Sequence, residues 1–448
     1  MLPAARTLQR PDGRAARVVP RVGRTLVAPA VVVLVLALLL PLALGSVFGA
    51  VVALGAAVLM LALVTFGIES TAIGLLALGF VLAPMNDVRP VAALTFVTMS
   101  DVFLVLSIGL LLPILVTGRF ERQALFLVGA AGVVGLGLVT SVAGDHALAS
   151  LNGLLRLLVG ALMLPVTFML WRPRRNIVTL LAAAYVLGNS ISVLQAVASG
   201  LVSYEGRAIG LTRHPNILGL CSMLALTLIP FLLQELPRWS GWIVLAAAGV
   251  CGYGVWISGS RAALLVAVAM VAVYLVLSRS VERGLLLFGA SIVPVYLVGR
   301  TLSSGDVGNN ILNRFVGGGS ASASDLAREQ LVREAVERFL SSPVLGVGFA
   351  DALEAHNIYL QVAASGGVAG LAFYLVLLAS VVRQPLRLPS RYRLLALPAF
   401  GYVLVGFITP LLWDRYIWCL LALPFLMSVR GEADDSAPSR NDALQETA

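Results

Sequence analysis

Long apolar runs separated by short polar connections dominate the chain. From Leu26 to Met427 these runs recur with lengths of roughly 20 residues, which allows a helix to cross a hydrocarbon core about 30 Å thick. The candidate spans are 26–44, 47–67, 71–85, 99–117, 124–142, 150–170, 177–200, 215–233, 241–258, 262–278, 284–300, 357–381, 393–410 and 415–430. The predicted fold is therefore all-α, a polytopic transmembrane helical bundle of about 12–14 spans.

The composition supports this class and excludes others. Of the 448 residues, 59% are hydrophobic and 12% are charged, whereas about 25% of a soluble domain is charged. Every one of the 31 basic residues is an arginine. The chain therefore lacks the phosphate-binding lysine of an ATP-hydrolysing P-loop and any Schiff-base lysine. We predict no cofactor and no nucleic-acid partner. We also predict no metal site, because the outer face offers no His, Asp or Glu grouping at ligand spacing.

Arginines concentrate in every second connection between the predicted spans. Positively charged short loops stay in the cytoplasm, so this alternation predicts that both termini are cytoplasmic. The Arg-rich connections contain Arg119 and Arg122; Arg172, Arg174 and Arg175; Arg279 and Arg283; and Arg383, Arg387, Arg391 and Arg393. The intervening connections, including the long one near residue 330, then face outward.

The predicted organisation follows from these spans and loops. Its five parts are a basic cytoplasmic tail (1–25), the first part of the bundle (26–300), an external loop (301–356), the last part of the bundle (357–430) and a disordered cytoplasmic tail (431–448). The external loop begins with a Gly/Ser-rich stretch. Residues 325–342 then place apolar side chains at helical spacing, which predicts an amphipathic helix that lies on the membrane or caps a cavity.

Charged and polar residues from distant segments gather on the predicted outer face. They are Arg207, Arg213, His214, Arg261, Arg328, His356 and Asn357. Guanidinium groups are planar, permanently charged donors, so several of them together suit an anionic headgroup such as a lipid pyrophosphate. A histidine beside them suits proton transfer near neutral pH. The alternatives are snorkelling for a single interfacial arginine and a hydrogen-bonded structural role for a lone interfacial histidine.

Two arginines lie within or between apolar runs. Arg261 follows Ser-Gly-Ser at a tight connection, so its guanidinium lies near the membrane surface or folds back into the bundle. We favour a functional role there, because burying an unpaired charge is costly. Arg156 lies several residues inside an apolar run. An indirect contribution to phosphate binding, from behind the residues that touch the phosphate, and snorkelling are equal alternatives for it.

Three sequence blocks carry a family resemblance. They are GLTRHPNILGL at 210–220, SGSRAALL at 258–265, and a third block that runs from Arg328 through SSPVLGVGF to AHNIYLQVAASGGVAGLAFYL. Together they resemble the family of O-antigen ligases and O-antigen polymerases. The blocks cover about a quarter of the chain, and their order and outward placement agree with the family pattern. One departure is Val332, where the family often has an aromatic residue.

The resemblance implies a function and roles for the matching residues. Family members act in the bacterial cytoplasmic (inner) membrane, where they take a glycan from an undecaprenyl-pyrophosphate carrier and move it onto a glycan or lipid-glycan acceptor at the outer face. By resemblance, Arg261 and Arg328 bind the pyrophosphate leaving group among the membrane lipids, and His356 deprotonates or positions the acceptor hydroxyl. The first block contributes further substrate-binding candidates without a chemical assignment, namely Arg213, His214 and Asn216. Arg207, just before that block, is a weaker candidate.

Several alternatives stay open. Ligation and polymerisation use the same site residues, so the sequence does not separate them. Displacement with inversion fits the absence of a clear carboxylate nucleophile, although Asp351 and Glu354 lie near His356. A secondary transporter or flippase of a lipid-linked glycan is a different class, for which Asp101 is the main candidate near the bilayer midplane. The crowding of polar residues at the outer face favours chemistry there over alternating access.

Overall fold

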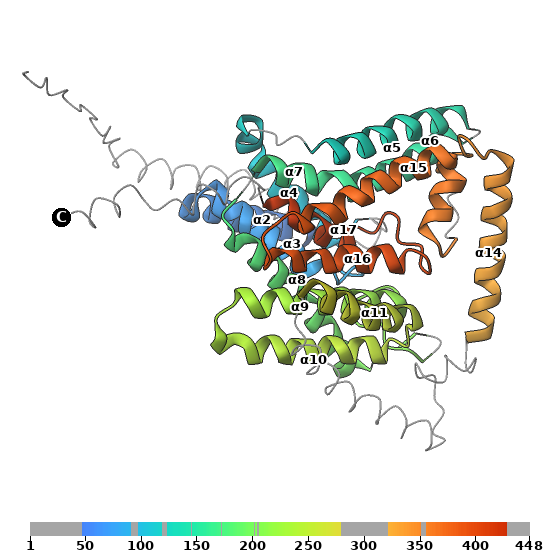
Figure 1. Ribbon diagram of the computed structural model, residues 1–448. Coiled ribbons are helices and arrows are strands. Elements are labelled where there is room, and N and C mark those ends of the chain that lie inside the picture. The colour runs from blue at the N-terminus through green and yellow to red at the C-terminus, as the bar shows by residue number, and fades with distance from the viewer. Residues whose placement is uncertain are drawn as a thin grey trace, which may run out of the picture. The chain divides into compact units, whose positions relative to one another are not determined.

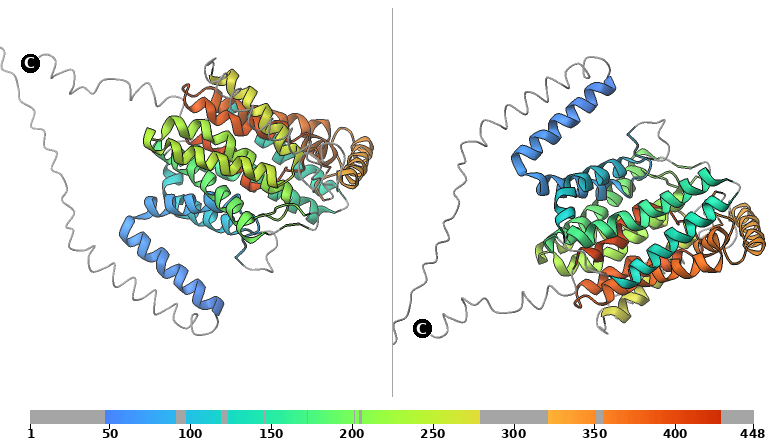
Figure 2. Two further views of the ribbon diagram at one scale, coloured as in Figure 1. Left: turned by 90° about the horizontal axis from the view of Figure 1, so that it is seen from below. Right: turned by 90° about the horizontal axis from the view of Figure 1, so that it is seen from above.

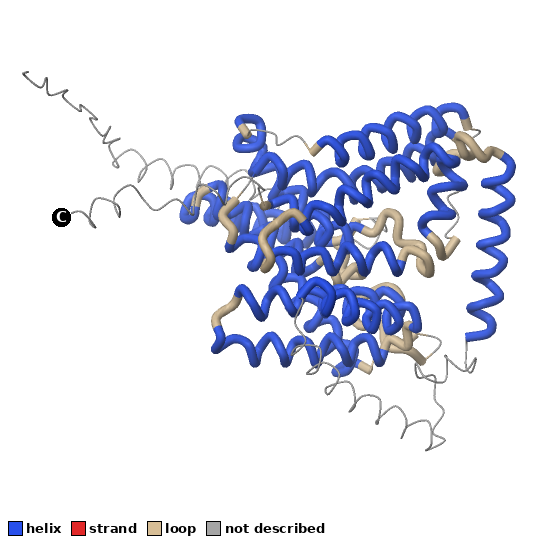
Figure 3. Tube along the Cα trace, viewed as in Figure 1, coloured by secondary structure: helices blue, strands red, loops and turns tan. Residues whose placement is uncertain are grey.

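The computed structural model describes residues 47–90, 97–118, 123–144, 146–171, 173–200, 202–203, 206–278, 321–350 and 355–427. Every named element in these ranges is a helix (Figure 3). An isolated antiparallel bridge joins Val202 to Ala208. Within the described part of the chain, nine helices are long and apolar enough to cross a membrane, and three shorter apolar helices accompany them. The prediction of an all-α, polytopic membrane bundle is confirmed.

The chain divides into two compact units, Met1–Thr71 and Ala72–Ala448. In the first unit, α2 (Val47–Phe66) ends before Gly67, whose φ of +81° favours glycine and separates α2 from the start of α3 (Ile68–Leu82). Many large apolar side chains of α2 are exposed, among them Val51, Leu54 and Val58.

The second unit contains the rest of α3 and all later elements (Figure 1). These are α4 (Met99–Thr117), α5 (Ala124–Ala143), α6 (Ala147–Leu158), η1 (Val159–Met163), α7 (Leu164–Trp171), α8 (Asn176–Ser199), α9 (Pro215–Glu235), η2 (Arg238–Ser240), α10 (Gly241–Ile257), α11 (Arg261–Ser278), α14 (Ala321–Ser341), α15 (Ile358–Leu386), η3 (Tyr392–Leu395), α16 (Ala396–Val405), α17 (Arg415–Ala422) and η4 (Leu423–Leu426). Every predicted span coincides with one or more of these helices or α2, except 26–44 and 284–300. Those two spans and both predicted tails lie outside the described residues. The Gly/Ser-rich stretch also lies outside them up to residue 320, whereas its last four residues, 321–324, form the first turn of α14.

Close approach between helix backbones holds the second unit together. A Cβ atom on Gly188 of α8 would lie 1.8 Å from the carbonyl oxygen of Val81, and one on Gly129 of α5 would lie 2.5 Å from the backbone nitrogen of Leu377 in α15. Small residues permit such contacts, and the resulting van der Waals packing drives helix association in lipid. In the core, the ring of Trp418 packs edge-on against a buried tyrosine at a centroid distance of 5.5 Å.

A kink divides α15, and the segment before this helix compensates for it. Gly367 has φ of 64° and ψ of −168°, a conformation essentially restricted to glycine. The backbone groups freed by the kink pair with residues 343–348. The N–H groups of Val347 and Gly348 donate to the carbonyls of Ala364 and Ser365 at 3.0 and 2.9 Å, and that of Val368 donates to Pro343 at 2.8 Å. The Pro-x-x-Gly-x-Gly segment of the third block is therefore a clasp on the kinked helix.

Segments predicted to face outward lie together at one end of this unit. Arg213 forms an ion pair with Asp87 at 3.8 Å, and the backbone N–H of Phe349 donates to Ser150 Oγ at 2.6 Å. Helix α14 crosses that end of the bundle: it runs crosswise to the other helices in Figure 1 and is seen end-on in both views of Figure 2. The predicted helix over 325–342 is confirmed as α14, which begins four residues earlier.

The apolar face of α14 is only partly buried. Ala335 is 1% exposed and Phe339 is half-buried, whereas Val332, Val336 and Leu340 are exposed. The predicted apolar stripe is thus wider than the surface that α14 buries. Val332, the departure from the family pattern, lies on the exposed part of that stripe.

Candidate functional site

The turn between α10 and α11 presents Arg261 at the end of the bundle. Gly259 has φ of +60°, which lets the chain reverse within three residues. Ser258 and Ser260 satisfy nearby backbone donors: Ser258 Oγ accepts from the N–H of Ser260 at 3.2 Å, and Ser260 Oγ accepts from that of Ala263 at 3.4 Å. The serines therefore close the turn and cap α11, so that Arg261 becomes the first residue of the helix.

Arg207 supports this turn from inside the protein. Its side chain is only 2% exposed; Nε donates to the carbonyl of Ser258 at 2.8 Å, and Nη2 donates to Asn216 Oδ1 at 2.5 Å. A Cβ atom on Gly259 would lie 3.2 Å from Arg207 Nε, so the packing is close. Arg207 and Asn216 were predicted as substrate-binding candidates. The structure places them beneath the turn, where they tie it to the start of α9.

The two arginines predicted to bind pyrophosphate meet at one carboxylate. Arg261 Nη2 and Arg328 Nη1 both pair with Asp325 Oδ1, the latter at 3.5 Å. The arginine side chains are 21% and 23% exposed and that of Asp325 is 50% exposed, so the group opens to the surface. The sequence patterns did not single out Asp325, although its position three residues before Arg328 on a helix was a usable signal.

His356 lies in an unusual backbone conformation at the entry to α15. Its φ of 49° makes it the one non-glycine residue with positive φ in the described ranges. Its Nδ1 is buried and has no hydrogen-bond partner. Burial, followed by the positive charges of Arg328 and His214, lowers the pKa of His356 to about 4. The imidazole is therefore neutral at neutral pH and can accept a proton.

Asn357 and His214, which directly follow His356 and Arg213 in the sequence, cap helices. Asn357 Oδ1 accepts from the N–H of Leu360 at 3.0 Å at the start of α15, and His214 Nδ1 accepts from the N–H of Asn216 at 3.1 Å at the start of α9. Because Nδ1 of His214 accepts, a neutral His214 carries its proton on Nε2. These caps set the direction in which the chain enters both helices.

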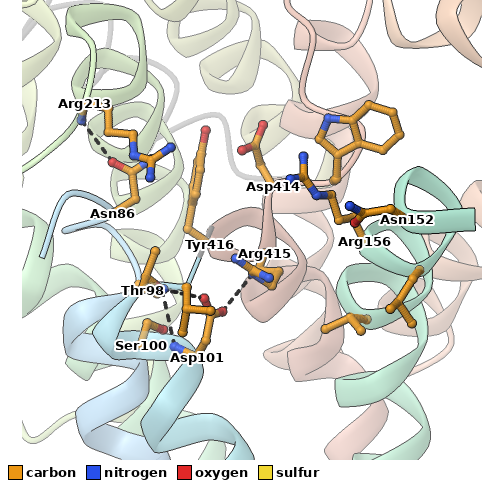
Figure 4. Close-up of a pocket in the computed structure, with 15 residues that line it drawn as sticks. Asn86, Thr98, Ser100, Asp101, Asn152, Arg156, Arg213, Asp414, Arg415 and Tyr416 are labelled. Carbon is orange, nitrogen blue, oxygen red and sulfur yellow. Dashed lines mark hydrogen bonds and ion pairs between the residues drawn. The ribbon is translucent and has the colours of Figure 1, made fainter. Parts of the chain in front are cut away.

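Arg156 and Arg213 line a cavity of about 470 Å³ instead of joining the Asp325 group. Figure 4 shows Arg213 and Asn86 on one side of it and Arg156 on the other. Burial and the nearby charge of Arg89 lower the pKa of Arg213, while Asp87 opposes them. Arg156 lines this polar cavity, where its charge can be solvated inside the bundle.

An ion pair between distant segments forms part of the same cavity wall. Arg415 Nε lies 2.8 Å from Asp101 Oδ1, and the other carboxylate oxygen of Asp101 accepts from the N–H of Thr98 at 2.8 Å. Asp101, the candidate for ion coupling in the transporter hypothesis, thus caps α4 and neutralises an arginine. In the described residues, no group of three or more His, Cys, Asp or Glu side chains is arranged to hold a metal.

The fold and site define a multi-pass membrane protein with charged side chains gathered at one end of its helical bundle. A family model described as O-antigen ligase matches residues 244–375. This segment begins in α10 and includes Arg261, Asp325, Arg328 and His356. The resemblance carried by the second and third blocks is therefore confirmed, and it supports a role in membrane glycan transfer and polysaccharide biosynthesis. No curated protein matches the chain significantly.

Proposed function

We propose that the protein transfers or polymerises glycan from an undecaprenyl-pyrophosphate-linked donor onto an acceptor hydroxyl at the outer face of the bacterial cytoplasmic membrane. The observation that carries this proposal is the convergence of Arg261 and Arg328 on one anionic group beside a neutral His356, all within the segment that matches the O-antigen ligase family. The acceptor is a second glycan or a lipid-linked glycan, and membrane lipids surround the site. Both termini lie in the cytoplasm.

Arg261 and Arg328 bind the pyrophosphate of the donor. Asp325 already forms ion pairs with both guanidinium groups, so the two side chains can reach one anion at the same time. A pyrophosphate carries more charge and more acceptor oxygens than a carboxylate and competes with Asp325 for these donors. The two guanidinium groups stabilise the charge that grows on the leaving group, and they do so without a metal ion.

His356 accepts the proton of the acceptor hydroxyl. The acceptor oxygen attacks the anomeric carbon as the bond between that carbon and the pyrophosphate oxygen breaks, and the electron pair leaves with the undecaprenyl pyrophosphate. Attack from the face opposite the leaving group inverts the anomeric configuration. A bound pyrophosphate also offsets the charge of Arg328, which is one cause of the low pKa of His356, and so makes the imidazole a better base in the complex.

Arg213, His214 and Arg156 contribute to substrate binding next to this centre. Three other residues act indirectly. Arg207 and Asn216 hold the SGSR turn and so position Arg261. Asn357 caps the start of α15 and so positions His356. Arg207 in particular is too buried to reach a ligand on the surface. These roles divide the predicted site residues into those that contact substrate and those that position others.

The test is a transfer assay with purified protein and a lipid-pyrophosphate-linked oligosaccharide, without nucleotide sugar, ATP or added metal. We expect a product ladder for a polymerase and single transfer to an added acceptor for a ligase. Arg261→Ala, Arg328→Ala and His356→Ala should each abolish product. Arg333→Ala is the matched control, because Arg333 lies on α14 with a 71% exposed side chain and pairs only locally with Glu329 among the ion pairs described. Retained activity in the site variants, or none in wild type with a verified donor, would contradict the proposal.

A further inference from the structure

The cavity bounded by Asn86, Asp101, Asn152, Arg156 and Arg415 is separate from the Asp325 group. It lies between the start of α4, the middle of α6–η1 and the chain that enters α17 (Figure 4). Its volume of about 470 Å³ falls within the range of small-molecule sites. The two arginines proposed to bind pyrophosphate, Arg261 and Arg328, and the proposed base His356 are not among the residues that line it.

The polar groups of the cavity wall are held in place by the fold. Asp101 pairs with Arg415 at 2.8 Å and also accepts from Thr98 N and Oγ1 at 2.8 and 2.9 Å. Elsewhere in the wall, Asn86 Oδ1 accepts from the backbone N–H of Arg213 at 3.1 Å. Ionisable residues are costly inside a membrane bundle and usually line a functional, water-filled cavity. A rigid wall of this kind presents its donors and acceptors in a fixed pattern, as a binding site requires.

The chemistry of this wall fits sugar hydroxyls better than a polyphosphate. Asn86 and Asn152 offer both donors and acceptors, Asp101 and Asp414 offer acceptors, and the arginines offer donors. A hydroxyl group is both donor and acceptor, so it can use all of these partners. A pyrophosphate uses only donors and would be repelled by the two carboxylates. Trp413 and Tyr416 add aromatic surface, which suits the apolar face of a pyranose ring.

The cavity also adjoins the proposed reaction centre. Arg213 lines it, and the next residue, His214, is one of the two groups whose charge lowers the pKa of His356. The other group is Arg328, which belongs to the pair that binds pyrophosphate. His356 is therefore coupled to the donor side through Arg328 and to the cavity side through His214.

We propose that this cavity is an acceptor subsite that binds a hydroxyl-rich saccharide and delivers one of its hydroxyl groups toward His356. The saccharide lies against Trp413 and Tyr416, and Asn86, Asn152 and Arg156 bind its hydroxyl groups. The direction of delivery rests on the proposed function, whereas saccharide binding itself does not.

The first test measures binding without turnover. Labelled full-length protein in detergent is applied to an array of defined pyranose oligosaccharides, in the presence and absence of inorganic pyrophosphate. We expect Asn152→Leu and Arg156→Met to weaken oligosaccharide binding roughly fivefold to tenfold each, the loss expected for one hydrogen-bonding partner. Arg328→Ala should leave it unchanged. Leu148→Ala is the control, since Leu148 lies on the same helix, is 86% exposed and is outside the cavity.

The second test uses the transfer assay. Asn152→Leu should raise the KM for the acceptor roughly fivefold or more and leave the KM for the lipid-linked donor unchanged. No oligosaccharide binding in wild type, equal binding in the cavity variants, or loss of binding in Arg328→Ala would overturn the subsite. If binding is lost in the cavity variants and wild type shows no transfer, the subsite stands and the proposed function falls. If wild type transfers glycan and Asn152→Leu leaves the acceptor KM unchanged, the proposed function stands and the subsite falls.

Discussion

The kink in α15 permits a sharp test with two adjacent glycines. At Gly367, an alanine would have to adopt φ of 64° and ψ of −168°, a strained conformation that costs about 1–3 kcal/mol. Its Cβ would also lie 2.1 Å from the carbonyl oxygen of Val344. Moving that segment away breaks the bonds from Val368 to Pro343 and from Ala369 to Val344, each worth about 0.5–1.5 kcal/mol. The expected cost of Gly367→Ala is therefore about 2–6 kcal/mol.

Gly366→Ala is the matched control. A Cβ atom on Gly366 would have no neighbour within 4 Å, and this glycine does not have positive φ. Replacing a glycine in a helix by alanine is worth about 0.5–1 kcal/mol, so this variant should be neutral or slightly more stable. Two substitutions one residue apart thus have opposite predicted effects.

The measurement is thermal unfolding of the detergent-purified protein, followed by intrinsic tryptophan fluorescence, together with the transfer assay. Gly367→Ala should unfold at a clearly lower temperature than wild type and lose activity, because the clasp holds the kink of the helix that begins just after His356. Gly366→Ala should match wild type in both readouts. Equal unfolding temperatures for the two variants would refute the assignment of residues 343–348 as a clasp on the kink.

Three further predictions concern the charged groups. Arg261→Lys keeps the charge but loses the planar guanidinium group, so transfer should fall by at least about tenfold with an unchanged unfolding temperature. Full activity of this variant would show that the guanidinium group is not needed for pyrophosphate binding. His356 must be neutral to act as the base, so kcat/KM for the donor should stay flat as the pH falls to roughly 5 and decline around its pKa of about 4. As the pH is lowered, kcat should begin to fall earlier than kcat/KM, because bound pyrophosphate raises the pKa of His356 in the complex. Coincident pH profiles of the two parameters would contradict this coupling. Arg207→Met should lower the unfolding temperature and the activity together, since the carbonyl of Ser258 and the amide of Asn216 each lose a charged donor worth about 1.5–3 kcal/mol per bond. Arg207→Lys should show the same losses, because one ammonium group cannot replace two separate guanidinium donors.

The charged site shows which functional features were accessible from residue patterns. Arg261 and Arg328 were predicted from the outward cluster and the family blocks, and Arg261 also from the cost of burying a charge. The structure brings both to one carboxylate. The positive φ of His356 and the role of Asp325 were not predicted. Backbone strain has no one-residue signature outside glycine, and the carboxylate matters only because α11 and α14 meet there.

Local properties of the sequence determined the membrane helices. The number of consecutive apolar residues needed to cross a bilayer is a fixed length, so the predicted spans in the described ranges match α-helices such as α8 and α9 without knowledge of their neighbours. Helical spacing of apolar residues likewise predicted α14. The partners of these helices were decided only in three dimensions, because they depend on where small residues such as Gly188 allow backbones to meet.

Tertiary structure alone decided the cavity and the burial of Arg207. Asp101 and Arg415 are more than 300 residues apart in the sequence, yet they form one wall because α4 and α17 begin at the same end of the bundle. An arginine in a polar loop gives no indication of whether it faces water or supports a turn; that depends on contacts with residues far away in the chain. Span length is a property of the local sequence, whereas a binding site is a property of how the spans pack.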